Sequence, residues 1–377
     1  MTRSTRIFPC LGALLSAGLL LPAGAAGQTA APPVATLSIE EYEPKSTLVV
    51  PEHRVPRARF PFIDVHNHQE SSARPEEIDR IVRDMDALGM RVMVNLSGGS
   101  GDVLAAGVRN WSGLHPGRFV TFANLDFSGI ENAAWGTRAA AQLERDVRQG
   151  GARGLKIFKN FGLTVKDRAG RRIPVDDSRL DAVFEKCADL KIPVLIHSGE
   201  PRSFFEPQDA HNERWLELKQ FPQRARPPDR FPTFEQVMGE QHRLFARHPR
   251  TTFIDAHLGW MGGDLASLGA LLDRLPNVTT EIGAVLAELG RQPRFAREWF
   301  IRYQDRVMMG KDTWAPEEYP VYFRVLETAD EYFDYYRRRH AFWKMYGLDL
   351  PDEVLRKLYY RNALRVIPGI DSAAFPQ

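Results

Sequence analysis

The sequence predicts an α/β fold, a (β/α)8 barrel with a loop insertion after the fifth strand and extra C-terminal helices. From residue 60 onward, short apolar runs alternate with helical patterns, which is typical of parallel strands joined by crossover helices. Eight such units occupy roughly 310 residues, which suits a barrel of about 250 residues plus insertions. Several apolar runs also end in a histidine or an aspartate, at the strand ends where such barrels carry their sites.

The first residues carry the features of a cleaved secretory signal. Arg3 and Arg6 precede an apolar stretch, 11–21, which is too short to span a bilayer, and small residues follow at 23–27. The mature protein would therefore be periplasmic or secreted. The domains that we expect are a signal peptide at 1–27, an N-terminal linker or strap at 28–59, and the metal-dependent barrel at 60–370.

Charge and cysteine content restrict the function classes. Cys10 would leave with the signal, and Cys187 lies in an amphipathic helical pattern, so we expect a buried structural thiol and no internal disulfide. The formal net charge of +2 gives no reason to expect a nucleic-acid partner, or a membrane-binding surface after signal cleavage. The expected partner is a small-molecule substrate, and the sequence leaves open whether the chain forms a homo-oligomer.

Each strand is predicted from an apolar, largely β-branched or aromatic run between turn residues. The predicted strands are 62–68, 91–96, 119–125, 154–159, 193–197, 252–257, 278–282 and 307–310. Helices with apolar residues at helical spacing are predicted at 76–88, 137–149, 178–190, 233–247 and 265–274. A doubly wound open sheet is the alternative fold, but it more often shows a glycine fingerprint after its first strand. Here the first strand ends in His-Asn-His instead.

Two longer segments extend the predicted barrel. Residues 202–232 follow the fifth strand and are rich in Pro, Arg and aromatic residues, so we expect a lid or a substrate wall. Residues 317–339 are rich in Tyr, Phe and Arg, and we expect helical cover over one edge of the site. A closing helix at 355–366 is expected to seal the barrel.

The end of the first strand carries the pattern on which the functional prediction is based. His66 and His68 alternate along a strand, so both side chains point to the same face. Histidine is the commonest metal ligand among side chains. The pair alone is a moderate signal, because two surface or capping histidines are equally compatible with it.

Later strands supply further metal-capable residues at the same structural level. Lys156 lies late in the fourth strand, His197 ends the fifth, His257 ends the sixth and Asp312 follows the eighth. Because the carboxyl ends of all strands meet at one rim of a barrel, these side chains are expected to converge there with the first-strand histidines. The sequence therefore predicts a metal site.

With these motifs the chain resembles the amidohydrolase superfamily, in its amidohydrolase-related branch (amidohydrolase family 2). The resemblance covers roughly residues 60–368. Its ordered motifs are Asp64-Val65-His66-Asn67-His68, Gly154-Leu155-Lys156, Leu195-Ile196-His197-Ser198-Gly199, Ala256-His257-Leu258-Gly259, Met309-Gly310-Lys311-Asp312 and Tyr360-Arg361-Asn362-Ala363-Leu364-Arg365.

The resemblance implies a role for each matching position. It implies that His66, His68 and Asp312 bind one divalent ion, with His197 as a further ligand or close neighbour. It also implies that His257 orients the attacking water or the substrate, and that Asp312 takes the proton of the water. These roles agree with the chemistry of metal-bound water, because a bound metal lowers the pKa of the water to about 7 and a neighbouring carboxylate can accept the proton. Zinc is the ion that we expect, although iron and other divalent ions accept the same ligands.

Lys156 and Glu200 have open roles. In binuclear relatives the matching lysine is carbamylated and bridges two metals, so the chain would hold two ions if Lys156 is carbamylated and one ion otherwise. The alternatives are an ammonium that binds a substrate carboxylate and an ordinary strand-end lysine. Glu200, after the fifth strand, is a substrate contact, an outer partner of the ligands, or a solvated loop carboxylate.

Several neighbouring residues have weaker signals. Asp64 and Asp255 precede ligand histidines by two positions and are candidate hydrogen-bond partners of them. Glu281, near the end of the seventh strand, is a candidate that faces the site. His242 and His248 flank a helix that we interpret as structural. Arg202, His211, Arg214 and Trp215 are candidates for substrate recognition, although a solvated helix face explains each of them as well.

Three functions follow from these observations. The first is a metal-dependent hydrolase that uses metal-activated water to cleave an ester, lactone or amide bond. The second is a metal-dependent decarboxylase on the same scaffold. The third is a non-catalytic periplasmic binding protein, which the complete ligand set argues against. Substrate, metal number and oligomeric state are not encoded in these motifs, because specificity resides in the loops.

Overall fold

The computed structural model describes residues 36–377. The chain forms two compact units, one up to Ser46 and one from Thr47 to Gln377, and all strands and helices described below belong to the second. The predicted signal peptide at 1–27 lies outside the described residues, as does the start of the predicted linker. Within residues 36–377, the helices are too short or too polar to cross a membrane.

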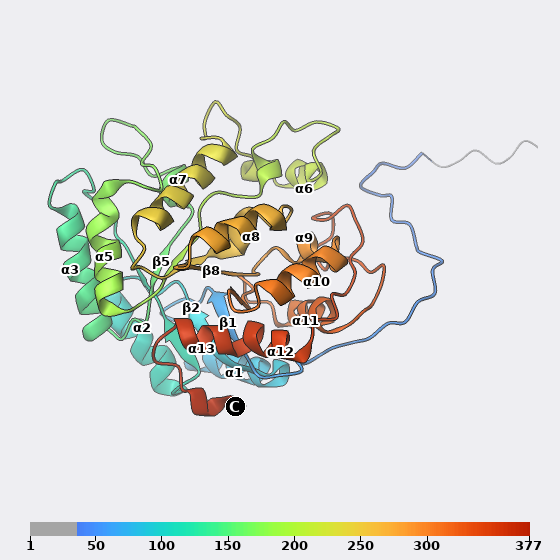
Figure 1. The fold of residues 1–377 in the computed structure, drawn as a ribbon, viewed down its shortest axis with the longest axis horizontal. Helices are drawn as coiled ribbons and strands as arrows, with labels where there is room; N and C mark the ends of the chain where they lie inside the picture. Colours follow the sequence, from blue (N-terminus) through green and yellow to red (C-terminus); the bar gives the residue numbers. More distant parts are fainter. Residues whose placement is uncertain (1–35) are drawn as a thin grey trace, which may run out of the picture. The chain divides into compact units, whose positions relative to one another are not determined.

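The second unit is a TIM barrel of parallel strands with helices around them (Figure 1). The strands run in chain order through a sheet of β1, β2 and β3 and a sheet of β4 to β9, and every neighbouring pair is parallel. The strands are β1 (Phe62–Asn67), β2 (Met90–Asn95), β3 (Phe119–Thr121), β4 (Ala123–Asn124), β5 (Leu155–Ile157), β6 (Val194–Ile196), β7 (Phe253–Asp255), β8 (Val278–Glu281) and β9 (Val307–Met308). The predicted strands thus correspond to observed ones, although most are shorter.

The predicted strand 119–125 is interrupted at Phe122. On one side β3 pairs with β2, and on the other β4 pairs with β5. Phe122 is buried, and a Cβ on Gly154 would lie 2.4 Å from its ring, so the ring packs directly on the glycine backbone. At the opposite side of the barrel, the Val65 N–H donates to the Met309 carbonyl at 2.9 Å, which brings β1 next to the end of β9.

The helices follow the predicted alternation with two additions. The main ones are α1 (Pro75–Leu88), α2 (Gly101–Leu114), α3 (Trp135–Arg148), α5 (Asp181–Leu190), α7 (Phe234–Arg247), α8 (Leu265–Arg274) and α10 (Pro293–Arg302). Helices α2 and α10 were not among the predicted ones. Helix α2 begins at Gly101, the end of the glycine-rich segment after β2, and it buries Leu104 and Trp111 against the barrel. Its apolar residues are sparse, so its periodicity in the sequence is weak.

The two predicted extensions lie after β6 and β9. The first contains η2 (Arg202–Phe204), α6 (Trp215–Gln220) and η3 (Pro222–Arg224). The second begins with α11 (Tyr319–Glu327), but residues 328–350 form no helix, so helical cover is shorter than predicted. The closing helix consists of α12 (Asp352–Arg356), a π-helical turn η6 (Lys357–Arg361) and α13 (Asn362–Val366). Two further short helices are α4 (Asn160–Leu163) and α9 (Leu286–Gly290).

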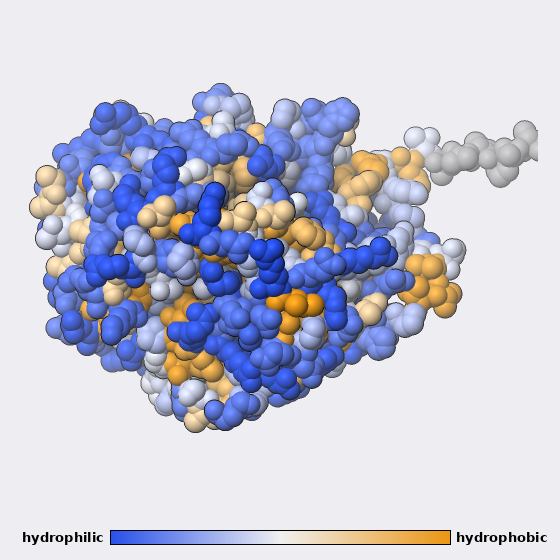
Figure 2. Space-filling view, viewed as in Figure 1, coloured by the Kyte–Doolittle hydropathy of each residue, from blue (hydrophilic) through white to orange (hydrophobic). Residues whose placement is uncertain are grey.

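The core lies between the strands and the surrounding helices. All residues of β1, β6, β7 and β8 are buried, as expected for parallel strands that are covered on both faces. Helix α1 buries one stripe, Ile78, Ile81, Val82, Met85 and Leu88, against this core. The face of the molecule in Figure 2 is mainly hydrophilic, with apolar residues in separate small patches. Cys187 is buried and unpaired, and burial raises the pKa of its thiol, as expected for a structural cysteine.

Candidate metal centre

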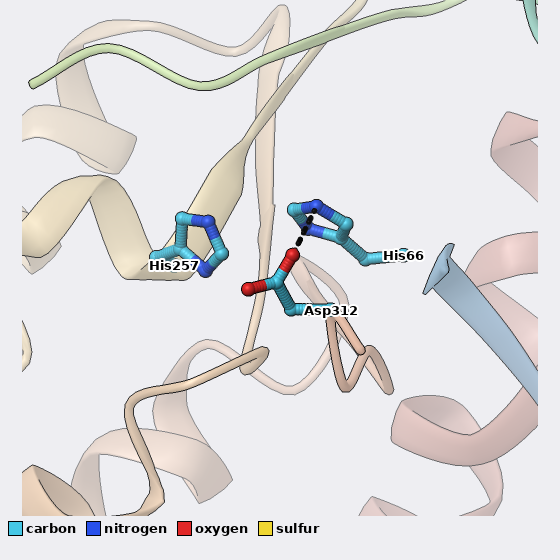
Figure 3. A group of neighbouring side chains, drawn as sticks. All are labelled: His66, His257 and Asp312. Atoms are coloured by element: carbon cyan, nitrogen blue, oxygen red, sulfur yellow. Dashed lines mark ion pairs between the residues drawn. The ribbon is translucent and has the colours of Figure 1, made fainter. Parts of the chain in front are cut away.

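Three metal-capable side chains converge at the carboxyl ends of the strands. His66 is on β1, His257 follows β7 and Asp312 follows β9, and one ligand atom from each lies within 4.8 Å of the others (Figure 3). Their side chains point toward a common centre from three separate elements. The parallel arrangement produces this convergence, because all the strands end at the same rim.

Hydrogen bonds fix which ring nitrogen of each histidine faces the centre. His66 Nδ1 lies 2.9 Å from Glu281 Oε1, and His257 Nδ1 lies 2.7 Å from the Gly283 carbonyl oxygen. Both oxygens accept, so Nδ1 carries the proton in each ring and Nε2 presents a lone pair. A carboxylate or carbonyl behind a histidine is the usual arrangement around metal ligands.

The charge states also suit a cation. Burial lowers the pKa of His66 to about 4, so its imidazole is neutral at neutral pH. Burial alone would raise the pKa of Asp312, but His68 and the other neighbouring histidines outweigh burial and hold the pKa well below its usual value. Neutral imidazoles and an ionised carboxylate are the forms in which these groups bind metals.

Distances between the ligand atoms fit one shared ion. Two atoms that each lie ~2.0–2.1 Å from one ion in tetrahedral geometry are about 3.3 Å apart. His66 Nε2 and Asp312 Oδ1 are 3.3 Å apart, although both atoms are electron-pair donors. His68 Nε2 and Asp312 Oδ1 are 3.5 Å apart. The donor set and its spacing therefore fit a divalent cation.

The two remaining predicted ligands lie at the edge of this cluster. His68 Nδ1 forms a hydrogen bond with Ser97 Oγ at 2.8 Å, and the His68 ring is partly exposed. His197 Nδ1 lies 3.1 Å from His257 Nε2, and its own Nε2 is buried without a partner. His257, for which the resemblance implied a role beside the metal, thus lies in the tight group with His66 and Asp312, and His197 contacts the His257 Nε2 atom that faces the centre.

Lys156 lies inside the same cluster. Its Nζ is 3.5 Å from His66 Nε2, and its side chain is buried at the end of β5. Burial lowers the pKa of its amine to about 7, with the nearby Asp312 and Glu281 acting in the opposite direction. Its position is compatible with either functional role that the sequence leaves open, a bridging carbamate or a substrate-binding ammonium.

Glu281 connects the ligands to one another. It is fully buried, and its two oxygens contact His66 Nδ1, the His257 backbone N–H at 2.6 Å and the Gly283 N–H at 2.5 Å. Burial would raise its pKa, but the two histidines and the N–H donors lower the pKa to about 2. A Cβ at Gly310 would lie 2.2 Å from Glu281 Oε2, so only glycine leaves space for this carboxylate.

The backbone around His257 is unusual. Residues 257–260 all have positive φ, between 53° and 59°, and three of the four are not glycine. This conformation costs about 1–2 kcal/mol per non-glycine residue, and such strain is concentrated at functional sites. Gly259 is required here, because a Cβ would lie 2.4 Å from Asp255 Oδ2. Asp312 also has a positive φ of 86°.

Two predicted partners make other contacts. Asp64 accepts from the backbone N–H of His66 at 3.0 Å and from the Tyr319 hydroxyl at 2.6 Å, so it holds the strand end and not the ring of His66. Asp255 accepts from Gln241 at 2.9 Å and not from His257. Asp64 is therefore a hydrogen-bond partner of His66 through the backbone, whereas the contact expected for Asp255 is absent, because His257 Nδ1 faces the Gly283 carbonyl.

A small cavity of about 120 Å³ opens above the cluster. His197, Asp312 and Trp260 line it from the barrel side, and both extensions contribute its outer wall. Glu200 lies in this wall, and its Oε1 is 2.8 Å from Lys159 Nζ and 2.6 Å from Arg226 Nη2. Glu200 is therefore a buried carboxylate that holds two cations at the cavity.

Glu217 joins the two extensions over the cavity. It is fully buried on α6, and its carboxylate pairs with Arg214, Arg224 and, at 3.2 Å, His340. Arg214 and Arg224 come from the extension after β6, and His340 comes from the segment after α11. Arg214 thus contributes to the site, whereas Arg202 pairs with Glu235 on α7.

Several site residues had weak or no signals in the sequence. Trp260 stacks on the His257 ring with centroids 4.5 Å apart, but it follows the histidine in an unusual turn that no sequence pattern indicates. Ser97, which contacts His68, follows the second predicted strand and belongs to none of the motifs. Arg337 belongs to the extension predicted as helical cover, His340 follows it, and only the fold brings both to the cavity.

The parallel barrel and the histidine and aspartate cluster at the carboxyl ends of its strands place the protein among the barrel proteins that can bind a metal ion at this rim. The family model described as Amidohydrolase (Amidohydro_2) matches residues 63–369. The chain therefore belongs to the amidohydrolase family 2, whose members are enzymes.

Solved structures agree with this fold. One is 2,6-dihydroxybenzoate decarboxylase complexed with 2,6-dihydroxybenzoate, with 14% identity and a TM-score of 0.52, covering 81% of this chain and 99% of that chain. Another is 2,6-dihydroxybenzoate decarboxylase from Rhizobium, with 14% identity and a TM-score of 0.50, covering 81% and 98%. At this identity the similarity establishes the fold. A search of curated proteins found no match.

Proposed function

We propose that this protein is a metal-dependent hydrolase that cleaves an ester, lactone or amide bond of a small molecule. The observation that carries the proposal is the convergence of His66, His257 and Asp312, with their ligand atoms within 4.8 Å of one another. An ion held there would supply Lewis acidity, which polarises a substrate carbonyl and acidifies water. Zinc remains the ion that we expect, with one ion per chain.

The residues of the chain would divide the remaining work. Asp312 is ionised and reaches the centre with Oδ1, so it can take the proton of the attacking water and return it to the leaving group. His257 is fixed by Gly283 with Nε2 toward the centre, so it can orient the water or the substrate. Glu281 would keep both rings in place through its contacts with His66 and the His257 backbone.

A decarboxylase is the second candidate, and Lys156 favours it. As an ammonium 3.5 Å from His66 Nε2, Lys156 would hold a substrate carboxylate beside the ligands, whereas the cations in the wall of the small cavity already pair with carboxylates of the chain. The two neighbouring structures named above are decarboxylases of a dihydroxybenzoate, a substrate with such a group.

Product analysis distinguishes the two reactions. The purified protein, with its metal content measured, is incubated with panels of lactones, esters, amides and hydroxybenzoates in water enriched in ¹⁸O. Incorporation of the label into a new carboxylate supports the hydrolase. Release of carbon dioxide without label in the product supports the decarboxylase and overturns the first proposal. A protein without metal, with ligand binding unchanged in Asp312→Asn, would indicate the non-catalytic binding protein.

The metal stoichiometry tests the role of Lys156. We expect one ion per chain, and Lys156→Met should retain it while raising KM for an anionic substrate. Two ions per chain, with one lost in Lys156→Met, would instead indicate a bridging carbamate. Arg337→Met, at the rim of the cavity, is the control for loss of a positive charge away from the ligands.

We also propose that the mature protein is periplasmic or secreted. The proposal rests on the charged, apolar and small-residue pattern of residues 1–27. Mass spectrometry of the protein purified from a cell envelope fraction should give a mature N-terminus between residues 26 and 28. An intact N-terminus in the cytoplasmic fraction would contradict it.

A further inference from the structure

A second and larger cavity adjoins the small cavity above the metal ligands. Its volume is about 630 Å³, within the usual range of ligand pockets and well above the 120 Å³ of the small cavity. We call it the distal chamber. Its walls come from residues 201–214, from α7 between Phe234 and His242, and from segments 260–267 and 284–291, the last of which includes α9.

The two cavities share part of their walls. Pro201, Arg214, Trp260 and Ala284 line both. Trp260 is the main partition, because one face of its ring stacks on His257 at 4.5 Å and its side chain also borders the distal chamber. The two cavities therefore meet at Trp260, and a molecule that reaches from the metal ligands to the distal chamber would pass this ring.

The lining of the distal chamber suits an uncharged and mainly apolar group. Phe234, Met238, Met261 and Val285 contribute apolar surface beside Trp260. The arginines in the wall are already paired with carboxylates.

These arginine pairs neutralise the positive charge of the wall, and Glu206 and Asp264 add negative charge to it. Arg202 pairs with Glu235, Arg291 pairs with Glu213 at 2.7 Å, and Arg214 contacts Glu288 at 3.3 Å. An anionic tail would have to compete with these carboxylates, whereas a neutral one would not.

Two glycines in the wall of the distal chamber have room for a side chain. Gly239 lies on α7 in the wall, and a Cβ there would meet only the end of the flexible Arg243 side chain, at 3.4 Å. Gly263 is similar, with only Arg291 within reach of a Cβ, at 3.5 Å. Larger residues at these positions would extend into space that is now free.

We propose that the distal chamber is the subsite for the non-reacting part of the substrate, a neutral, mainly apolar body of ring size. This inference rests on the proposed function, because it places the reacting group at the metal ligands. It assigns the substrate to a class with two parts: a small metal-binding head in the 120 Å³ cavity and an aromatic or alicyclic tail beyond Trp260.

A pair of hydroxamic acids tests the inference by binding alone. Acetohydroxamic acid provides only a metal-binding head, and 2-naphthylacetohydroxamic acid adds a neutral bicyclic tail. Calorimetric titration of the metal-loaded protein should show binding at least about tenfold tighter for the naphthyl compound. Gly239→Leu should remove this advantage and leave the affinity for acetohydroxamic acid and the metal content unchanged.

Control variants exclude general effects. Gly113→Leu places the same side chain on helix α2, where a Cβ would meet nothing within 4 Å, and should keep the full advantage of the naphthyl compound. Ser267→Phe is a second variant, at an exposed position in the wall, in case Gly239→Leu fails to fold. It should reduce the advantage in the same direction.

The outcomes separate the two proposals. If both hydroxamates bind with equal affinity, or if the advantage persists in Gly239→Leu and Ser267→Phe, the distal subsite is wrong and the metal-dependent function stands. If neither compound binds the metal-loaded protein, the proposed function fails and the subsite falls with it. Tighter binding of the naphthyl compound that both filling variants abolish supports the subsite.

Discussion

Glu281 shows how one residue can organise a site without touching the reacting atoms. Its carboxylate faces His66 Nδ1 on one oxygen and the Gly283 N–H on the other, and it also accepts from the His257 backbone. The position of both rings therefore depends on one buried charge. Partners of this kind typically change metal affinity by 10–100-fold.

We predict that Glu281→Gln lowers metal affinity by about 10–100-fold. The amide keeps the size of the side chain but removes the charge that faces His66 and places an NH₂ group against one of the N–H donors. Dialysis against graded chelator buffers, followed by elemental analysis, measures the change. Unaltered retention of the metal would show that His66 is held by other contacts.

The matched control is Glu327→Gln. Glu327 is also a buried carboxylate, but it accepts from the Tyr359 hydroxyl at 2.7 Å and from the Arg59 N–H at 3.0 Å, and neither partner belongs to the site. This variant should keep the metal affinity of the parent protein. Circular dichroism of both variants checks that the fold is intact.

The site could be predicted from the sequence at some residues and not at others, for a geometric reason. His66, His257 and Asp312 were found because each follows an apolar run, and parallel strands bring such ends together. Glu281 gave only a weak signal, because its partner His66 is 215 positions away and the contact depends on how the strands face each other across the barrel.

At the scale of elements, the turn of residues 257–260 places His257 and Trp260 through a backbone conformation that most residues avoid. The surrounding contacts sustain it: Glu281 accepts from His257 N, and Met261 N donates to the Leu258 carbonyl at 3.0 Å. Gly259 is the residue in the turn that tolerates no side chain.

We predict that Gly259→Ala destabilises the protein by more than the about 1–2 kcal/mol that the left-handed conformation alone costs. The added Cβ would also lie 2.4 Å from Asp255 Oδ2, so the turn has to shift and His257 with it. Urea unfolding measures the change, and metal content should fall in parallel. Equal stability of the variant and the parent would mean that the turn adapts without strain.

Gly113→Ala provides the comparison within a regular helix. Gly113 lies on α2, where a new Cβ meets nothing within 4 Å, so the substitution should be neutral or stabilise by about 0.5–1 kcal/mol. The two variants differ only in the backbone conformation and space at the glycine. If Gly259→Ala lowers the free energy of unfolding and Gly113→Ala does not, the effect is due to the turn.

Elements with strong periodicity were predicted well, and those without it were not. Helix α1 buries a clear stripe and begins within one residue of its predicted start. Helix α2 begins in a glycine-rich stretch that reads as a loop, and the predicted strand 119–125 is broken at Phe122. Strand pairing on different sides of Phe122 is a property of the assembled barrel, which local sequence does not encode.

At the scale of the whole molecule, the segment before β1 is fastened to the barrel by polar contacts. The Arg59 guanidinium lies 2.8 Å from Asp352 and donates to the Glu327 carbonyl oxygen at 3.0 Å, and the Ala58 N–H donates to the Leu88 carbonyl at 3.1 Å. The segment therefore connects α1, α11 and α12.

We predict that Arg59→Met lowers the free energy of unfolding by about 1 kcal/mol, because the guanidinium is partly exposed and its ion pairs are screened. Arg74→Met removes a more exposed ion pair, with Glu77 at 2.7 Å, and should change stability by less than Arg59→Met does. Urea unfolding of both variants provides the comparison. Equal effects would mean that the segment contributes nothing beyond a surface pair.

The stability of the molecule should also depend on pH through His242. Burial lowers the pKa of His242 from 6.5 to about 4, with Arg274 acting in the same direction. The unfolded chain therefore takes up the proton more readily, so the contribution of His242 is complete above pH 6.5 and is lost as pH falls toward 4. We predict that His242→Gln shows a smaller loss of stability between pH 6.5 and pH 4 than the parent protein.

Thermal unfolding across this pH range measures the difference. His115→Gln is the control, because His115 pairs with Asp79 at 2.7 Å on the surface and does not carry the burial that affects His242. Identical pH profiles of the parent and His242→Gln would show that other groups dominate acid unfolding.

Glu217 has a consequence for engineering. One carboxylate neutralises Arg214 and Arg224 from one extension and His340 from the other, so the two loops form a single electrostatic unit. Replacing either loop alone with that of a relative would leave a buried charge without its partner. Replacing both loops together would keep the charges paired. Libraries that aim to change selectivity should therefore vary the two loops together.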